Sequence, residues 1–158
     1  MRIFGLLGKS LSHSFSSSYF NEKFSKEGIT NTEYLNFELN DISEFPQLIK
    51  THNLSGLNVT LPYKESIIPF LDELSKNAKS IGAVNTIQIA NGKLIGHNTD
   101  IIGFKQSITP LLAGRNTALI LGDGGAAKAV KFVFNQLNIS CKTINRNSSF
   151  DYSDITSQ

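Results

Sequence analysis

Residues 1–112 alternate between two patterns of hydrophobic and polar positions. Short apolar runs that end at a glycine, a proline or a polar cluster predict strands, and apolar residues spaced three or four apart predict helices. On this basis we expect strands at 2–7, 33–38, 57–61, 83–89 and 93–97, and helices at 16–26, 42–51, from 62 onward and at 100–112. The Asn91-Gly92 pair is a strong hairpin signal between the last two strands. Alternating strands and helices predict an α/β fold.

The pattern changes near residues 112–115, and a second unit follows. Residues 117–121 form an apolar run typical of a buried parallel strand. A glycine-rich stretch comes next, followed by an expected helix at 128–137 and an expected strand at 141–144. We therefore predict an N-terminal α/β domain over residues 1–113 and a second unit built on one βαβ motif over residues 114–158.

The composition excludes several classes of protein. Of the 158 residues, 40% are hydrophobic and 18% are charged, which suits a folded core and argues against disorder. The formal charge of +2 comes from scattered Lys and Arg, so we expect no nucleic-acid partner. Because no stretch has the length of a signal sequence or a membrane span, we expect no membrane association. The single cysteine, Cys141, suits a reducing compartment, and we expect a cytoplasmic location.

The turn after the strand at 117–121 carries a glycine pattern, Gly122-Asp123-Gly124-Gly125-Ala126-Ala127. In dinucleotide sites, the first glycine permits a tight turn, the second lets the backbone approach the pyrophosphate, and a small third residue allows close helix packing. The helix N-terminus adds free N–H groups and a partial positive charge for the anion. Such a string also arises by chance, but here the strand before it and the helix after it are both clear. We predict a Rossmann-type dinucleotide site.

The following strand indicates which dinucleotide is bound. An NAD site usually places Asp or Glu about 20 residues after the glycines, to hold the ribose 2′-hydroxyl. This chain has Asn145-Arg146-Asn147 at that point. A guanidinium suits a 2′-phosphate, although an arginine in a surface turn is the structural alternative. We predict NADP rather than NAD.

A lysine and an aspartate stand out in the first unit. Lys64 follows the expected strand at 57–61, and Asp100 follows the expected strand at 93–97. If the two side chains meet, they form an acid/base pair beside a ligand site. Taken singly, Lys64 is explained as a solvated side chain in a first helical turn and Asp100 as a helix cap.

Smaller polar side chains lie at similar junctions. Ser14 and Ser16 follow the first strand and suit either a helix cap or a carboxylate ligand. Thr60 suits a strand, and Asn85 suits a turn. We assign no metal ligands. The order of these polar residues and motifs along the chain is more specific than any one of them alone.

The ordered set of motifs resembles the shikimate dehydrogenase family over essentially the whole chain. The motifs are Ser14/Ser16, Asn58-Val59-Thr60, Lys64, Gly82-Ala83-Val84-Asn85-Thr86, Asn98-Thr99-Asp100 and Gly122-Asp123-Gly124-Gly125-Ala126. The resemblance implies an N-terminal substrate domain joined to an NADP-binding Rossmann domain. It also implies NADPH-dependent reduction of 3-dehydroshikimate to shikimate in aromatic amino-acid biosynthesis.

The resemblance also implies roles for individual residues. Lys64 would be the catalytic acid/base and Asp100 its partner. Ser14 and Ser16 would hold the substrate carboxylate, while Thr60, Asn85 and Asp100 would hold ring hydroxyls. Gly122, Asp123, Gly124, Gly125 and Ala126 would cradle the pyrophosphate, and Asn145, Arg146 and Asn147 would face the adenosine phosphate.

Residues 115–158 hold one βαβ unit, so we expect an incomplete Rossmann domain with an uncovered apolar face. There are two alternatives. One is a quinate/shikimate dehydrogenase, and Arg146 argues against an NAD-linked enzyme of that kind. The other is a non-catalytic small-acid-binding module. The oligomeric state stays open.

Overall fold

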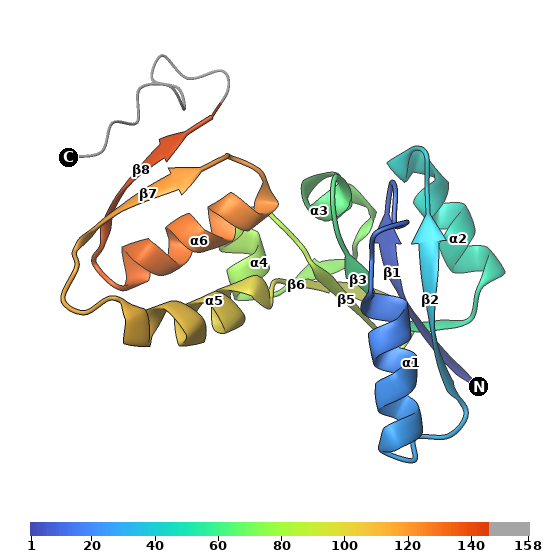
Figure 1. Cartoon of the computed structure of the whole chain (residues 1–158). Helices are drawn as coiled ribbons and strands as arrows, with labels where there is room; N and C mark the ends of the chain where they lie inside the picture. Colours follow the sequence, from blue (N-terminus) through green and yellow to red (C-terminus); the bar gives the residue numbers. More distant parts are fainter. Residues whose placement is uncertain (146–158) are drawn as a thin grey trace.

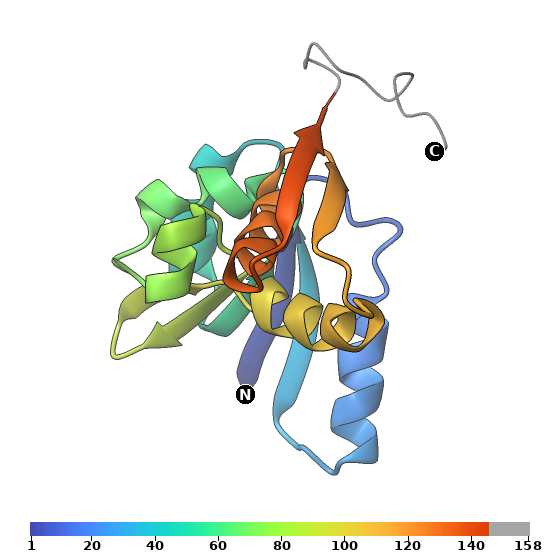
Figure 2. The same ribbon diagram turned by 90° about the vertical axis from the view of Figure 1, so that its left-hand side faces the viewer.

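The structure is a computed structural model that describes residues 1–145. Two bodies, each built around its own sheet, lie side by side in Figure 1, and the second lies in front of the first in Figure 2. The first sheet has six strands in the order β2-β1-β3-β5-β6-β4, and the second pairs β7 with β8. The prediction of an α/β fold is confirmed. None of the helices in residues 1–145 is both long enough and apolar enough to cross a membrane.

The six-stranded sheet mixes parallel and antiparallel pairs. Its elements are β1 (Arg2–Gly8), α1 (Ser16–Lys26), β2 (Thr32–Glu38), η1 (Ile42–Glu44), α2 (Phe45–Thr51), β3 (Leu54–Val59), α3 (Tyr63–Ser66), η2 (Ile68–Phe70), β4 (Glu73–Leu74), α4 (Lys76–Ile81), β5 (Thr86–Ala90) and β6 (Lys93–His97). Strand β1 pairs in parallel with β2 and β3, whereas β5 is antiparallel to β3 and β6. Leu7, Leu57 and Ile87 of its central strands are buried in the main core.

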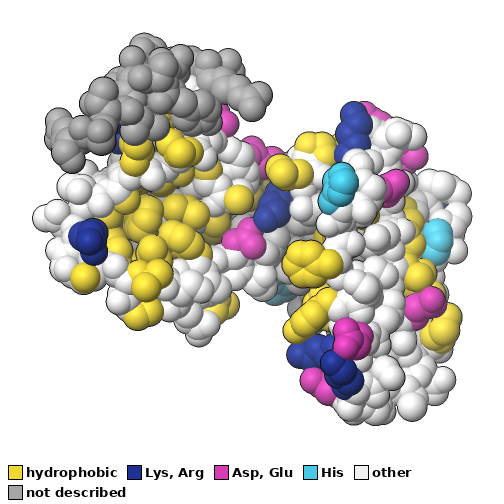
Figure 3. Space-filling model, viewed as in Figure 1, with side chains coloured by type: hydrophobic (Ala, Val, Ile, Leu, Met, Phe, Trp, Pro, Cys, Tyr) yellow, Lys and Arg dark blue, Asp and Glu magenta, His cyan; other side chains and the backbone are white. Residues whose placement is uncertain are grey.

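The second body contains α5 (Asp100–Ile108), η3 (Thr109–Leu111), β7 (Thr117–Leu121), α6 (Gly125–Gln136) and β8 (Ser140–Ile144). Strands β7 and β8 are parallel, and Ile120 packs against α6 in a separate core cluster. Strand β7 is parallel as expected, but it is buried on one face only. Leu119 and Leu121 on its other face are 44% and 59% exposed, as the expectation of an uncovered apolar face implied. Hydrophobic side chains accordingly gather on the surface of this body in Figure 3.

Most predicted elements are present, but several bounds differ. The hairpin is confirmed, with positive φ at both Asn91 (52°) and Gly92 (75°) as a tight two-residue turn requires. The strand expected at 57–61 ends at Val59, because the Thr60 carbonyl accepts a hydrogen bond from Tyr63 and the chain turns there. The helix expected from 62 begins at Tyr63 and is only four residues long.

Other differences follow from local geometry. The strand expected at 83–89 begins at Thr86, and the helix expected at 128–137 already begins at Gly125. The helices expected at 42–51 and 100–112 are each divided into an α-helix and a short 3₁₀ turn. Strand β4 and helix α4 were not predicted, since two and six residues are too few for a clear periodicity.

Candidate active site

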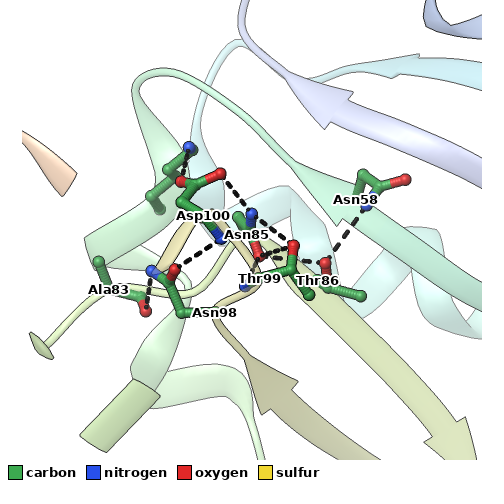
Figure 4. Close-up of polar contacts among 8 residues, drawn as sticks. Asn58, Ala83, Asn85, Thr86, Asn98, Thr99 and Asp100 are labelled. Atoms are coloured by element: carbon green, nitrogen blue, oxygen red, sulfur yellow. Dashed lines mark hydrogen bonds and ion pairs between the residues drawn. The ribbon is translucent and has the colours of Figure 1, made fainter. Parts of the chain in front are cut away.

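The register of the six-stranded sheet brings three distant segments to the carboxyl end of β3. Lys64 lies in α3, which follows β3 after a short turn. Asn58 near the end of β3 pairs with Thr86 at the start of β5, and Thr86 pairs with His97 at the end of β6. Asn85 and Asp100, labelled in Figure 4, therefore lie at the end of the sheet where α3 with Lys64 begins.

Lys64 and Asp100 form an ion pair, as the acid/base interpretation required. The Lys64 ammonium donates a hydrogen bond to Asp100 Oδ2 at 2.6 Å. The two side chains are only 15% and 33% exposed, so the explanation of Lys64 as a solvated lysine is wrong. Helix capping by Asp100 is wrong too, because Thr99 is the N-cap residue of α5 and no side chain caps it. The carboxylate instead faces Lys64 and Asn85.

Asn85 donates a hydrogen bond to the other oxygen of the Asp100 carboxylate. Its Nδ2 donates to Asp100 Oδ1 at 2.7 Å, while its Oδ1 accepts from the Thr99 backbone N–H at 2.9 Å. The Thr99 N–H can only donate, so the orientation of this amide is determined. Asn98 is buried and joins the segment before β5 to the start of α5. Its Nδ2 donates to the Ala83 carbonyl, and its Oδ1 accepts from the Asp100 backbone N–H. Both oxygens of Asp100 are thus held by donors from different segments.

Asn85 is held by a series of hydrogen-bonded polar side chains. The sequence analysis assigned no role to these supporting side chains. Tyr34 donates its hydroxyl proton to Asn58 Oδ1 at 2.8 Å, and Asn58 Nδ2 donates to the Thr86 hydroxyl at 3.3 Å. Thr86 in turn donates to Asn85 Oδ1 at 3.1 Å. Burial raises the pKa of Tyr34, so its phenol stays protonated and acts as the donor. The signal in the sequence was Asn58 itself, a polar residue between apolar Leu57 and Val59 in a strand.

Thr60 and Ser14 lie on loops that leave the carboxyl ends of β3 and β1, and Ser16 begins α1 after the second of these loops. Strands β1 and β3 are parallel neighbours, and the Thr60 amide donates to the Leu7 carbonyl at 2.8 Å. Ser14 accepts a hydrogen bond from the Ser16 amide at 3.3 Å, close to the start of α1. Within residues 1–145, no hydrogen bond joins either serine to Lys64 or Asp100. The carboxyl edge of parallel strands is the usual place for ligands in such sheets.

The glycine loop has the geometry that an anion site needs. Gly122 has φ of +109°, and its amide donates to the Ile144 carbonyl of the neighbouring strand. Gly124 is the N-cap residue of α6, whose first amides have no side-chain cap, and a Cβ at Gly124 would meet open space. Ala126 is exposed on the first turn of the helix.

The segment after β8 is described only in part. Asn145 Nδ2 donates to Asp123 Oδ2 at 2.8 Å, which joins the end of β8 to the glycine loop. The expected contacts of Arg146 and Asn147 with a cofactor lie outside the described residues. The loop and the end of β8 therefore lie together at one end of the β7–β8 pair.

Comparison with known proteins identifies the family. The family model for the shikimate dehydrogenase substrate binding domain matches residues 6–87, just over half of the chain. A curated NADP⁺ shikimate dehydrogenase from Syntrophomonas wolfei is 45% identical over 141 residues, which cover 87% of this chain and 48% of the relative.

Solved structures agree with this match. Shikimate dehydrogenase 1 from Peptoclostridium difficile is 32% identical with a TM-score of 0.80, and the match covers 100% of this chain and 71% of that one. The Thermus thermophilus enzyme, in complex with NADP(H) and shikimate, is 31% identical with a TM-score of 0.80, over 93% of this chain and 57% of its own. The chain spans about half the length of the curated relatives that it matches. On these matches, the chain belongs to the shikimate dehydrogenase family.

Proposed function

We propose that this chain carries the substrate site and part of the cofactor site of an NADP-linked shikimate dehydrogenase of the cytoplasm. The reaction is the reversible reduction of 3-dehydroshikimate to shikimate in aromatic amino-acid biosynthesis. We infer that residues 1–113 bind the substrate and that residues 114–158 begin the cofactor domain. The Lys64–Asp100 ion pair at the carboxyl edge of the sheet is the observation that carries this proposal.

Lys64 is proposed as the acid/base group. Reduction of a ketone builds negative charge on the carbonyl oxygen, and a positioned ammonium stabilises this charge and transfers a proton to the oxygen. In the reverse direction the amine accepts the proton of the hydroxyl. Asp100 accepts a hydrogen bond from Lys64 at 2.6 Å and so orients the Nζ atom.

Substrate binding is assigned to the side chains around this pair. Asn85 and Asp100 are proposed to bind ring hydroxyls, together with Thr60 on the adjoining turn. Ser14 and Ser16 are proposed to bind the carboxylate, because hydroxyls near a helix start suit an anion. The parallel pairing of β1 and β3 supports a shared site, since it places both loops at one edge.

The glycine loop fits the pyrophosphate of a dinucleotide. Its positive φ at Gly122, the open space at Gly124 and the uncapped start of α6 match what a phosphate requires. Gly122, Asp123, Gly124, Gly125 and Ala126 would hold that group, and Asn145, Arg146 and Asn147 would recognise the adenosine phosphate. When bound, NADPH would supply the hydride for reduction of the ketone, and NADP⁺ would accept it in the reverse direction.

The test replaces Lys64 and separates binding from turnover. Shikimate binding is measured by calorimetry, and shikimate oxidation is followed by NADPH absorbance. We expect Lys64→Ala to lower turnover roughly 10²–10⁴-fold, as for loss of a general acid/base group, with a much smaller change in shikimate affinity. The matched control is Lys79→Ala, which removes an exposed lysine of α4.

Each other outcome has a defined meaning. Substantial turnover by Lys64→Ala would overturn the role of that lysine. A preference for quinate with NAD over shikimate with NADP would favour a quinate/shikimate dehydrogenase. Shikimate binding without any turnover, even when the chain is extended to the length of its relatives, would favour a non-catalytic acid-binding module.

A further inference from the structure

An ion pair joins the two bodies beside the candidate active site. Glu65 follows Lys64 in α3, and Lys128 lies in the first turn of α6, directly after the glycine loop. Lys128 Nζ lies 2.5 Å from Glu65 Oε2, and each side chain is 42% exposed. The pair therefore connects the helix of the acid/base lysine to the helix that begins the cofactor site.

A close backbone approach marks the same interface. Gly122, Gly124 and Ala127 account for the dinucleotide pattern, which places no requirement on Gly125. A Cβ built at Gly125 would lie 3.0 Å from the Lys64 Cβ and 3.3 Å from the Ala83 Cβ. Gly125 therefore lets the start of α6 rest directly on the aliphatic stem of Lys64.

Apolar packing surrounds this contact. Ile81 and Ala83 of the first body form one buried cluster with Ile101 of α5 and Val133 of α6. The attraction between apolar side chains is non-directional. A charged pair at the edge has a defined geometry and distinguishes one rotation from another. The interface thus combines an apolar centre with a polar contact at its edge.

We propose that Glu65 and Lys128 are positioning residues that hold α6 against α3. The pair sets where the glycine loop lies relative to Lys64 and limits rotation between the two bodies. The effect of the Glu65–Lys128 pair on hydride transfer rests on the proposed function, whereas the contact between the two bodies does not. Because both side chains are partly exposed, salt weakens the pair.

The first test measures the distance between the bodies and needs no activity. Spin labels are placed at Gln47→Cys in α2 and Asn135→Cys in α6, both exposed positions, after Cys141→Ser removes the native thiol. We expect a narrow distance distribution that broadens in Glu65→Lys and in Lys128→Glu. The exchanged pair, carrying both substitutions, restores the narrow distribution. Equal widths in all four proteins overturn the proposal.

The second test measures turnover in the same variants. Each single reversal replaces attraction by repulsion, and we expect a fall in kcat of roughly three- to tenfold with an unchanged affinity for shikimate. The exchanged pair is expected to return to within about twofold of the unaltered chain. Lys131→Glu, which reverses an exposed lysine one turn along α6, controls for net charge.

The two proposals fail in different ways. If the unaltered chain binds no shikimate, the proposed function fails, but the distance measurement still tests the contact. If the unaltered chain turns over and the exchanged pair is as impaired as the single variants, the positioning role fails. A change in Lys131→Glu equal to that in Lys128→Glu would also overturn it, because the effect would then depend on net charge alone.

Discussion

Replacement of Asp100 by asparagine tests the arrangement of donors at the site. Both carboxylate oxygens accept hydrogen bonds, Oδ2 from Lys64 at 2.6 Å and Oδ1 from Asn85 at 2.7 Å. An asparagine offers one oxygen and one NH₂ group, so in Asp100→Asn one of the two donors faces another donor. Asn85 cannot simply flip, because its Oδ1 is held by the Thr99 N–H.

The magnitude follows from the cost of an unsatisfied buried donor. That cost is about 1–3 kcal/mol, and the one-third exposure of Asp100 places it at the lower end, about 1–2 kcal/mol. Since urea m-values are about 1–3 kcal/mol/M, we expect the urea midpoint of Asp100→Asn to fall by roughly 0.3–2 M. Circular dichroism during urea unfolding measures this midpoint.

Asp72→Asn provides the matched control. Asp72 Oδ2 accepts one hydrogen bond, from the Leu94 amide at 2.7 Å, and an asparagine oxygen can replace it. We expect this variant to lose less than about 0.5 kcal/mol, as surface substitutions usually do. If Asp100→Asn is as stable as Asp72→Asn, the inferred donor arrangement around Asp100 is wrong.

Two further predictions concern packing and pH. A Cβ at Gly103 of α5 would have no atom within 4 Å, so Gly103→Ala should raise the free energy of unfolding by about 0.5–1 kcal/mol. Gly125→Ala should show no such gain, because its Cβ would press on Lys64. Equal gains of the two variants in thermal unfolding would contradict the close contact at Gly125. Burial raises the pKa of both Tyr34 and Tyr63, so the folded chain keeps protons that the unfolded chain releases above pH 10.0. Stability should therefore be fully present below pH 10.0 and fall above it, by at most about 1.4 kcal/mol per pH unit for each tyrosine. Urea midpoints at pH 8 and pH 11 measure this loss, and Tyr34→Phe should reduce it; an unchanged pH dependence in that variant would show that Tyr34 does not contribute.

Local signals predicted the elements better than their bounds. The glycine loop and the Asn91-Gly92 hairpin were recognisable because their backbone conformations demand particular residues. The start of β3 was missed, because Ser55 and Gly56 interrupt its apolar run and only pairing with β1 and β5 makes it a strand. The roles of Asn58 and Thr86 depend on cross-strand register, which no short stretch of sequence contains.

The meeting of Lys64 and Asp100 depends on a turn that does not itself belong to the site. Asn91 and Gly92 close the hairpin and so establish the pairing of Thr86 with His97. A slip of one residue in that pairing would move Asp100 by about 3.3 Å along the strand and reverse the face of each β6 side chain. A 2.6 Å ion pair cannot survive such a displacement. The Asn91-Gly92 turn therefore helps to determine a contact between residues 36 positions apart, which we expected only from the family resemblance and not from the turn.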